Sequence, residues 1–386
     1  MLVRSNEGGN VNPAGILERS AVPFFDPGPS FSELKSTLIA EISELIDSGA
    51  FINGPQVGAF ETAFGDYCGA DHCVGVASGL DALRLGLIAA GIERGDEVIV
   101  PATTFVATLE GVTQAGGVPV LADISEDDYN IDPTAVEAAL TDRTRFLMPV
   151  HLYGQMADMR ALRVIAEQAG VAIIEDACQA HGAERNGLRA GASGLAAAFS
   201  FYPAKNLGAM GDAGALVTTD PEVAAIARAL REHGQTRKYH HEREGFTARL
   251  DTIQAIVLVH KLPLLDRWTE QRRAAAAAYR ETLDGIGDLV LPAVARGSEP
   301  VWHLYVVRTR EPQRLAEFLD DRGVKTGRHY PEPAHLSPAY AGLGYAQGSF
   351  PVTEQLAASL LSLPIFPGIS ESQIAAVVDV VTEYFA

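Results

Sequence analysis

The residue of this sequence best suited to covalent chemistry is a lysine in a turn, Lys205. It follows an apolar run, 195–201, that predicts a buried strand, and the strand must end before Pro203, which cannot donate a ladder hydrogen bond. Small residues after the lysine, as far as Ala213, allow the backbone to turn tightly. Partial burial beside such a strand lowers the pKa of a lysine and favours the nucleophilic, neutral amine. The sequence therefore indicates a Schiff-base lysine, and the alternative is a surface lysine in an ordinary turn.

Two further groups could work with this lysine. Asp176 follows the predicted strand 171–175, and its carboxylate could form a plain ion pair or hold a proton on a heterocyclic nitrogen. Ser78 and Gly79 lie between a predicted strand, 73–77, and the start of a helix. The free N–H groups at a helix start suit a phosphate, although a serine N-cap at an ordinary strand-to-helix junction also explains the pattern.

Together these groups match the needs of pyridoxal phosphate (PLP). That cofactor requires phosphate donors, an aromatic face, an acid partner for its pyridine nitrogen and a lysine that forms an imine. Phe105 supplies an aromatic ring, and Asp176 would keep the pyridine protonated so that it accepts electrons. Lys205 would move a proton between the substrate Cα and the cofactor C4′ as general acid and base. The residues thus favour a PLP enzyme.

The predicted secondary structure brings these residues together. Strands alternate with helices over most of the chain, which is typical of a mostly parallel sheet covered on both faces. Residues after the strands then meet at one edge of the sheet. The predicted strands of the sheet are 73–77, 97–100, 118–122, 145–150, 171–175, 195–201 and 213–219, and a further strand is predicted over 302–307 in the C-terminal part. The predicted helices include 31–46, 57–67, 82–90, 133–140, 159–168, 254–283, 312–322 and 373–384. The residues expected at the edge are Ser78, Gly79, Thr103, Thr104, Phe105, His151, Tyr153, Gln155, Asp176, Gln179, Lys205 and Asn206.

Length and composition limit the classes of protein to which this chain can belong. A chain of 386 residues can form a large and a small domain, and we expect an N-terminal extension over 1–22, a large domain over 23–265 and a small domain over 266–386. The net charge of −19 argues against nucleic acid or an anionic membrane as a partner. No apolar run has membrane-spanning length, and no signal segment is evident. Three cysteines at unsuitable spacing predict neither disulfides nor a zinc site, so we expect no metal and a cytoplasmic location.

Motifs along nearly the whole chain resemble the DegT/StrS-type sugar aminotransferases, which belong to the fold-type-I PLP enzymes. The motifs are F-I-N-G-P-Q-V-G-A-F-E from Phe51, S-G-L-D-A-L from Ser78, G-D-E-V-I-V-P-A-T-T-F-V-A-T from Gly95, H-L-Y-G-Q from His151, I-E-D-A-C-Q-A-H-G-A from Ile174, F-S-F-Y-P-A-K-N-L-G-A-M-G-D-A-G from Phe199 and R-L-D-T-I-Q-A from Arg249. Each motif alone is weak, but the set is specific.

This resemblance implies a fold and a role for each matching residue. The fold would be α/β, with a mostly parallel seven-stranded sheet between helices and a smaller α+β C-terminal domain. Lys205 would form the imine with PLP, and Asp176 would pair with the pyridine nitrogen. The other implied cofactor contacts are Gln179 with the ring hydroxyl, Phe105 on the ring face, Ser200 and the backbone of Gly79 and Leu80 with the phosphate, and further contacts from Asn206 and Thr247.

Two positions depart from the family pattern. Many members have threonine where this chain has Leu80, so only a backbone contact to the phosphate carries over. Thr247 stands where the family usually has an asparagine that reaches the phosphate of the partner subunit. The resemblance implies a homodimer with shared active sites, completed by segment 238–247 of the partner. Lys205 is retained, unlike in related dehydratases, which have histidine there.

The resemblance also implies a substrate. It is closest to enzymes that aminate a nucleotide-linked keto-deoxysugar, here expected to be a dTDP sugar, with L-glutamate as donor and pyridoxamine phosphate formed in the half-reaction. Segment 329–340 resembles the subgroup acting at a 3-keto carbon. A 4-keto sugar, a cyclitol and a regulatory role without catalysis are the alternatives.

A basic and aromatic stretch, 233–241, could offset the repulsion between this acidic chain and a sugar diphosphate. A solvated loop between helices is the alternative. The residues expected to bind the substrate are Arg237, Lys238, Tyr239, Arg249, His329 and Tyr330.

Overall fold

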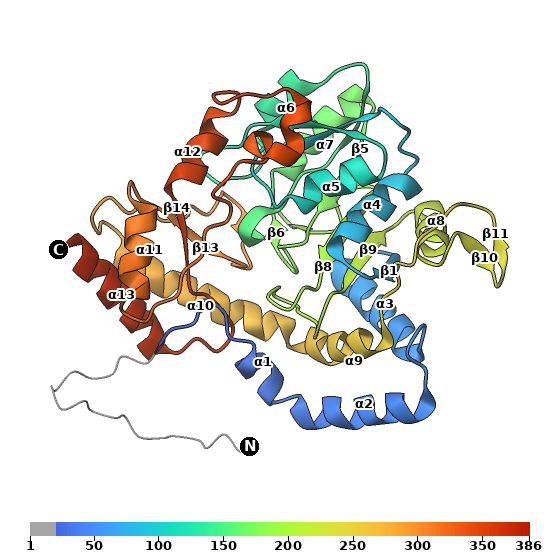
Figure 1. The fold of residues 1–386 in the computed structure, drawn as a ribbon, viewed down its shortest axis with the longest axis horizontal. Helices are drawn as coiled ribbons and strands as arrows, with labels where there is room; N and C mark the ends of the chain where they lie inside the picture. Colours follow the sequence, from blue (N-terminus) through green and yellow to red (C-terminus); the bar gives the residue numbers. More distant parts are fainter. Residues whose placement is uncertain (1–20) are drawn as a thin grey trace.

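The computed structural model describes residues 21–386, and Figure 1 shows their fold. The extension predicted over 1–22 lies outside the described residues, apart from its last two. Val22 is buried and pairs with Val324 near the other end of the chain. Val22 therefore belongs to the folded protein and not to an extension.

A seven-stranded sheet forms the centre of the molecule, as predicted. Its strands, in spatial order, are β1 (His72–Val76), β9 (Gly214–Thr218), β8 (Ala196–Ser200), β5 (Ala172–Asp176), β4 (Thr144–Leu147), β2 (Glu97–Pro101) and β3 (Val118–Ala122). Only β9 runs against its neighbours, and the other ladders within the sheet are parallel. The carboxyl ends of β2, β5 and β8 therefore point the same way, and the residues that follow them share one edge.

Helices cover both faces of this sheet because successive side chains of a buried strand point to opposite faces. Val98 and Ile174 pack on one face, and Ile99 and Ile173 pack on the other. The first face is covered by α4 (Gly79–Ala89), α5 (Ala107–Gln114) and α8 (Pro221–Arg231). The second face is covered by α3 (Pro55–Cys68), α6 (Pro133–Ala139), α7 (Met159–Ala169) and α9 (Thr252–Lys261).

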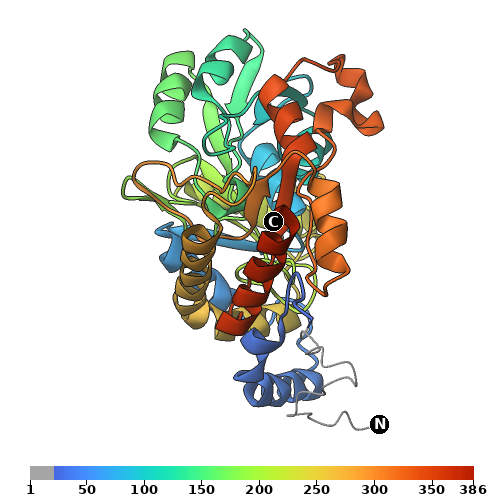
Figure 2. The same cartoon turned by 90° about the vertical axis from the view of Figure 1, so that its left-hand side faces the viewer.

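The C-terminal part of the chain has a core of its own. Helix α10 (Leu265–Leu283) leads into it from the large sheet, and Figure 2 shows this helix beside the C-terminal helix. The other elements are β13 (Tyr305–Arg308), α11 (Pro312–Asp320), α12 (Pro351–Ser359), β14 (Leu360–Leu363) and α13 (Glu371–Phe385). Tyr279 and Tyr305 are fully buried in this core, with rings 5.2 Å apart. Asp123, just after β3, accepts the N–H groups of Val352 and Thr353 and so ties α12 to the large sheet.

The structure also differs from the prediction in several places. The helix predicted over 31–46 is two helices, α1 (Gly28–Ser32) and α2 (Lys35–Ser48), and the helix over 254–283 is broken at Pro263 into α9 and α10. Segment 233–241 contains a small hairpin, β10 (Gln235–Arg237) and β11 (His240–His241), that was not predicted. Helices α5 and α12 were also not predicted.

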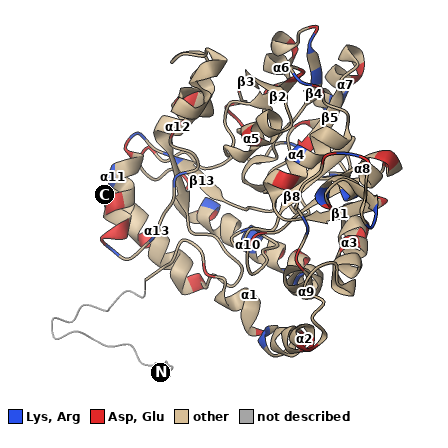
Figure 3. Ribbon diagram, turned by 45° about the vertical axis from the view of Figure 1, so that its right-hand side comes forward, with Lys and Arg blue, Asp and Glu red and all other residues tan. Residues whose placement is uncertain are grey.

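Charged residues lie on the outer helices and on the loops that join them. Figure 3 shows acidic and basic segments interspersed there, for example along α11. None of the helices formed within residues 21–386 has the length and apolar character that a membrane crossing requires.

Candidate active site

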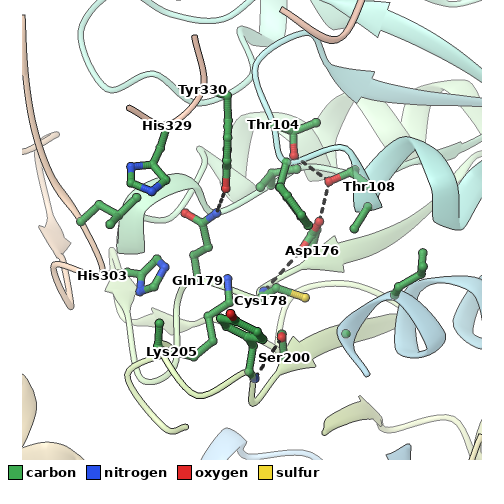
Figure 4. Close-up of a pocket in the computed structure, with 18 of the residues that line it drawn as sticks. Thr104, Thr108, Asp176, Cys178, Gln179, Ser200, Lys205, His303, His329 and Tyr330 are labelled. Atoms are coloured by element: carbon green, nitrogen blue, oxygen red, sulfur yellow. Dashed lines mark hydrogen bonds between the residues drawn. The ribbon is translucent and has the colours of Figure 1, made fainter. Parts of the chain in front are cut away.

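A cavity of about 480 Å³ lies at the carboxyl edge of the sheet, and side chains of the C-terminal part close its other side. Lys205, Asp176, Gln179, His303, His329 and Tyr330 all point into this region in Figure 4. Residues far apart in the sequence are thus gathered around one space. The sheet edge predicted from the sequence is the floor of this cavity.

Lys205 follows β8 in a turn closed by a hydrogen bond from its N–H to the carbonyl of Tyr202 (2.8 Å). Gly208, three residues after Lys205, must be glycine because a Cβ there would lie 2.3 Å from the carbonyl oxygen of Pro203. Burial removes water from the amine and lowers the pKa of Lys205 below the usual value for lysine, although the nearby Asp176 acts the other way. A larger fraction of the amine is therefore neutral and able to act as a base or nucleophile.

Asp176 ends β5 and is buried, with donors on both of its carboxylate oxygens. Thr108 donates to Oδ2 (2.7 Å), and the N–H of Cys178 donates to Oδ1 (3.2 Å). The hydroxyls of Thr104 and Thr108 are 2.6 Å apart, and because the proton of Thr108 points to Asp176, Thr104 is the donor of this bond. A chain of two hydroxyls thus holds the carboxylate in one orientation (Figure 4).

A second buried carboxylate supports this strand end from below. Glu175 accepts hydrogen bonds from His151 Nε2 (2.8 Å) and from the N–H groups of Gly191 and Ser193. Burial alone would raise the pKa of Glu175, but these donors lower it overall. The backbone N–H of His151 in turn donates to the backbone carbonyl of Asp176 (3.0 Å). His151 was predicted at the site, but it supports the strand end and does not line the cavity.

The start of α4 offers N–H groups to the cavity. Ser78 caps this helix by accepting the N–H of Asp81 (3.0 Å), and the first bond to a backbone carbonyl runs from Ala82 to Ser78 (3.0 Å). The N–H groups of Gly79 and Leu80 precede that bond, so they point out of the helix at its positive end. Both residues line the cavity. An anion fits this position.

Close approach of the backbone at this point requires glycine. A Cβ on Gly79 would lie 2.7 Å from Ser200 Cβ and 2.9 Å from Cys178 Sγ. A Cβ on Gly214 would lie 2.3 Å from the carbonyl oxygen of Ser78. Glycine at these two positions therefore lets the start of α4 pack directly against the end of β8 and against Cys178.

Gln179 and two aromatic residues form another wall. Gln179 accepts the N–H of Tyr153 through Oε1 (2.8 Å) and donates through Nε2 to the hydroxyl of Tyr330 (3.2 Å). The rings of Tyr330 and Phe105 are 5.6 Å apart, and Phe105 is half exposed at the cavity. The amide of Gln179 and the exposed face of Phe105 can both contact a flat, polar ring.

Two histidines of the C-terminal part face Lys205. His329 bonds to the hydroxyl of Ser362 (2.8 Å), and burial together with the charge of Lys205 lowers its pKa to about 4. His303 Nδ1 bonds to Asn206 Oδ1 (3.2 Å), and the amide of Asn206 donates to the carbonyl of Val301 (2.8 Å). Asn206 was expected to contact a cofactor. Its side chain is instead committed to this contact between the two parts of the chain and does not line the cavity.

Several predicted residues lie away from the cavity of their own chain, namely Arg237, Lys238, Tyr239, Thr247 and Arg249. The first three lie in or next to the hairpin of β10 and β11, which projects from the side of the molecule in Figure 1, and Tyr239 is 83% exposed. Arg249 forms an ion pair with Glu232 (2.8 Å), so within its own chain it contacts no substrate site.

Sequence reasoning missed part of the lining, including Phe24, Phe25, Thr108, Tyr202, Arg272 and His303. Thr108 lies on α5, which was not predicted, and Thr104 lies before that helix, so helical spacing did not indicate this pair. Arg272 lies in an alanine-rich helix and Phe24 near the start of the chain, and no local pattern indicates that either reaches the site.

Solved structures share this fold. DesV of S. venezuelae, solved in complex with a ketimine intermediate, superposes with a TM-score of 0.93 at 48% identity, covering 95% of this chain and 98% of that one. NtdA of Bacillus subtilis, solved with bound PMP, superposes with a TM-score of 0.88 at 31% identity, covering 95% of this chain and 85% of that one. The fold and the site therefore define the protein as an aminotransferase with the fold that DesV and NtdA share.

The family follows from the sequence comparisons. The profile of the DegT/DnrJ/EryC1/StrS aminotransferase family matches residues 32–382, and the chain belongs to this family. A dTDP-3-amino-3,4,6-trideoxy-alpha-D-glucose transaminase of Streptomyces venezuelae is 48% identical over 95% of this chain and 97% of the relative. A dTDP-3-amino-3,6-dideoxy-alpha-D-galactopyranose transaminase of Aneurinibacillus thermoaerophilus is 42% identical over 94% and 99%. A pleiotropic regulatory protein of Geobacillus stearothermophilus is 44% identical over 94% and 98%.

Proposed function

We propose that this protein is a PLP-dependent aminotransferase that transfers the amino group of L-glutamate to a nucleotide-linked 3-keto-deoxysugar, with a dTDP sugar as the expected substrate. One observation carries the proposal. A lysine of lowered pKa, an oriented carboxylate and the open start of a helix meet in one cavity of an aminotransferase fold.

The residues of the cavity fit PLP. Gly79, Leu80 and Ser200 would hold its phosphate, because all three line the cavity and the N–H groups at the start of α4 are free to bind an anion. Phe105 would contact the face of the ring, and Gln179 would contact its hydroxyl. When bound, PLP supplies an electron sink for the bonds at the amino-bearing carbon of the substrate.

The side chains of this chain would hold and move the protons of the reaction. Asp176, fixed by Thr108 and by the N–H of Cys178, would keep the proton on the pyridine nitrogen. The amine of Lys205 would take the proton from the amino-bearing carbon and return it elsewhere, which requires the neutral form that its lowered pKa favours.

The choice of a 3-keto sugar rests on the relatives whose names describe 3-amino sugars, at 48% and 42% identity. Segment 329–340 supports it, because His329 and Tyr330 line the cavity beside Lys205. We also propose that the chain divides into domains near residue 265, where α10 begins.

The hairpin supports a homodimer as part of the proposal. Lys238 and Tyr239 lie outside the cavity of their own chain, and Tyr239 is highly exposed. We propose that segment 238–247 reaches the cavity of the partner subunit, where Lys238 would contact the diphosphate of the substrate and Thr247 the cofactor phosphate.

The test uses the purified protein loaded with PLP and given L-glutamate. Dideoxysugar nucleotides with the ketone at C3 or C4 and a keto-cyclitol are offered as acceptors, and the products are identified by mass spectrometry. The proposal expects an amino-sugar nucleotide from the 3-keto acceptor and competition by thymidine diphosphate. Amination of the cyclitol without such competition would indicate a cyclitol aminotransferase, and absence of turnover with every acceptor would indicate a regulator.

A further inference from the structure

Lys261, the last residue of α9, is a buried cation outside the cavity. It is 3% exposed, and it does not line the cavity that contains Lys205. Its amine donates to the carbonyl of Gly208 (2.6 Å) and has no other hydrogen bond and no ion pair within residues 21–386. A buried ammonium without a carboxylate is unfavourable, and the loss of contact with water lowers the pKa of Lys261 to about 8. The proton transfers proposed for the cavity do not use this charge.

Two aromatic rings lie beside the amine of Lys261 in place of a counter-ion. Nζ is 4.2 Å from the ring centroid of Phe31 on α1 and 5.5 Å from that of Trp268 on α10. The face of an aromatic ring attracts a cation, and the attraction is stronger where water is excluded. With a pKa of about 8, most of the amine is still protonated at pH 7. Lys261 therefore directs a positive charge at one backbone carbonyl, that of Gly208.

Gly208 belongs to the loop that contains Lys205. The N–H of Ala209 donates to the carbonyl of Phe201 (2.8 Å), and this bond closes the loop. Gly208 packs directly on Pro203 within the loop, because a Cβ on Gly208 would lie 2.3 Å from the carbonyl oxygen of Pro203. A bond to Gly208 therefore holds both sides of the loop, and a displacement of Gly208 would also move the backbone of Lys205 between them.

We propose that Lys261 is a positioning residue, which fixes the loop of Lys205 through the carbonyl of Gly208. A charged donor suits this role, because its hydrogen bond is about twice as strong as one between neutral groups. The inference rests on the proposed function, in which the amine of Lys205 condenses with the aldehyde of PLP and releases water. Whether that amine reaches the aldehyde depends on where the loop places its backbone. Pyridoxamine phosphate (PMP) has an amine in place of the aldehyde and forms no covalent bond to Lys205, so its retention should depend little on the loop.

The first test measures the release of cofactor during dialysis from protein loaded with PLP or with PMP. Lys261→Met keeps a long, apolar side chain and removes the charged donor. This variant should release PLP roughly 10-fold faster than the parent protein, because a charged hydrogen bond is lost, and should release PMP within about twofold of the parental rate. His260→Asn is the matched control, since His260 precedes Lys261 on α9 and bonds to Glu41 on α2 (2.6 Å). The control should release both cofactors at the parental rates.

Three results of this test would overturn the inference. They are unchanged release of PLP from Lys261→Met, an equal acceleration for the two cofactors, which a general loosening of the fold produces, and faster release of PLP alone from His260→Asn. Lys205→Ala separates the inference from the proposed function, since it should accelerate the release of PLP alone and by more than Lys261→Met. If Lys205→Ala retains PLP as the parent does, the role proposed for Lys205 fails. If Lys205→Ala loses PLP and Lys261→Met does not, the inference alone fails.

The second test does not depend on the folding of Lys261→Met. Phe31→Leu changes a partly buried side chain, removes one aromatic face and leaves Lys261 in place. The bond to Gly208 should be weakened and not lost, so the release of PLP should become about 3-fold faster while the release of PMP stays at the parental rate. Unchanged release of both cofactors, or an equal increase for both, would contradict a hold that acts through the charge of Lys261.

Discussion

The two walls of the cavity are built in different ways. The wall on the large sheet consists of residues that directly follow strands or open a helix, such as Asp176, Lys205 and Gly79, and the backbone itself fixes their positions. The opposite wall consists of His303, His329 and Arg272, which reach the site only because the C-terminal part packs against the sheet. Chemistry at the cofactor would thus depend on the first wall, and recognition of the substrates would depend largely on the second.

The largest effect should come from the centre of the sheet wall. Lys205→Ala should reduce turnover about 10⁴-fold, since it removes the group that moves the proton. The visible absorption of bound PLP should change with it, because the link to the protein is lost. Steady-state assays measure turnover, and absorption spectra report on the bound cofactor. Turnover at the parental rate in this variant would show that a residue other than Lys205 moves the proton.

Asp176→Asn should separate binding from chemistry. The amide keeps the shape of the side chain but cannot stabilise a proton on the pyridine nitrogen, so turnover should fall about 100-fold while much of the cofactor is retained. Cofactor content after dialysis and turnover are measured on the same sample. An unchanged rate would show that the acid partner of the ring lies elsewhere.

Thr108 tests whether orientation of this carboxylate matters. Thr108→Val removes a donor to Asp176 and should lower turnover about 10-fold, whereas Thr108→Ser retains the hydroxyl and should stay near the parental rate. The pH dependence of the cofactor absorption should shift in the valine variant alone. Equal behaviour of the two variants would mean that Thr108 only fills space. Thr113→Val, on the same helix, is the control.

The hairpin should show the smallest effect. Lys238→Ala should raise the KM for the nucleotide sugar about 5-fold, because one charge-assisted contact to the diphosphate is lost. The half-reaction with L-glutamate, which has no diphosphate, should be nearly unchanged. Equal losses in the two half-reactions would show that the hairpin supports the fold or the cofactor.

These two walls also differ in how well the sequence predicted them. The sheet, its strand ends and the meeting of Asp176, Gln179 and Lys205 followed from alternating strands and helices, because parallel strands place the residues after them at a common edge. Asn206 was misjudged, since its neighbour in sequence reaches the cavity while its own side chain turns to Val301. Arg272 and Phe24 could not be predicted, because tertiary packing between distant segments brings them to the site.

The most direct test of the account asks which lysine holds PLP. Among residues 21–386, loss of contact with water lowers the pKa of two lysines, Lys205 and Lys261. Lys205 lines the cavity, whereas the amine of Lys261 bonds to the carbonyl of Gly208 (2.6 Å) and does not line it. Borohydride reduction of the PLP-loaded protein, followed by digestion and mass spectrometry, locates the modified residue. The account predicts one label, on Lys205. A label on Lys261 or another lysine, or no label on a protein that has bound PLP, would contradict it.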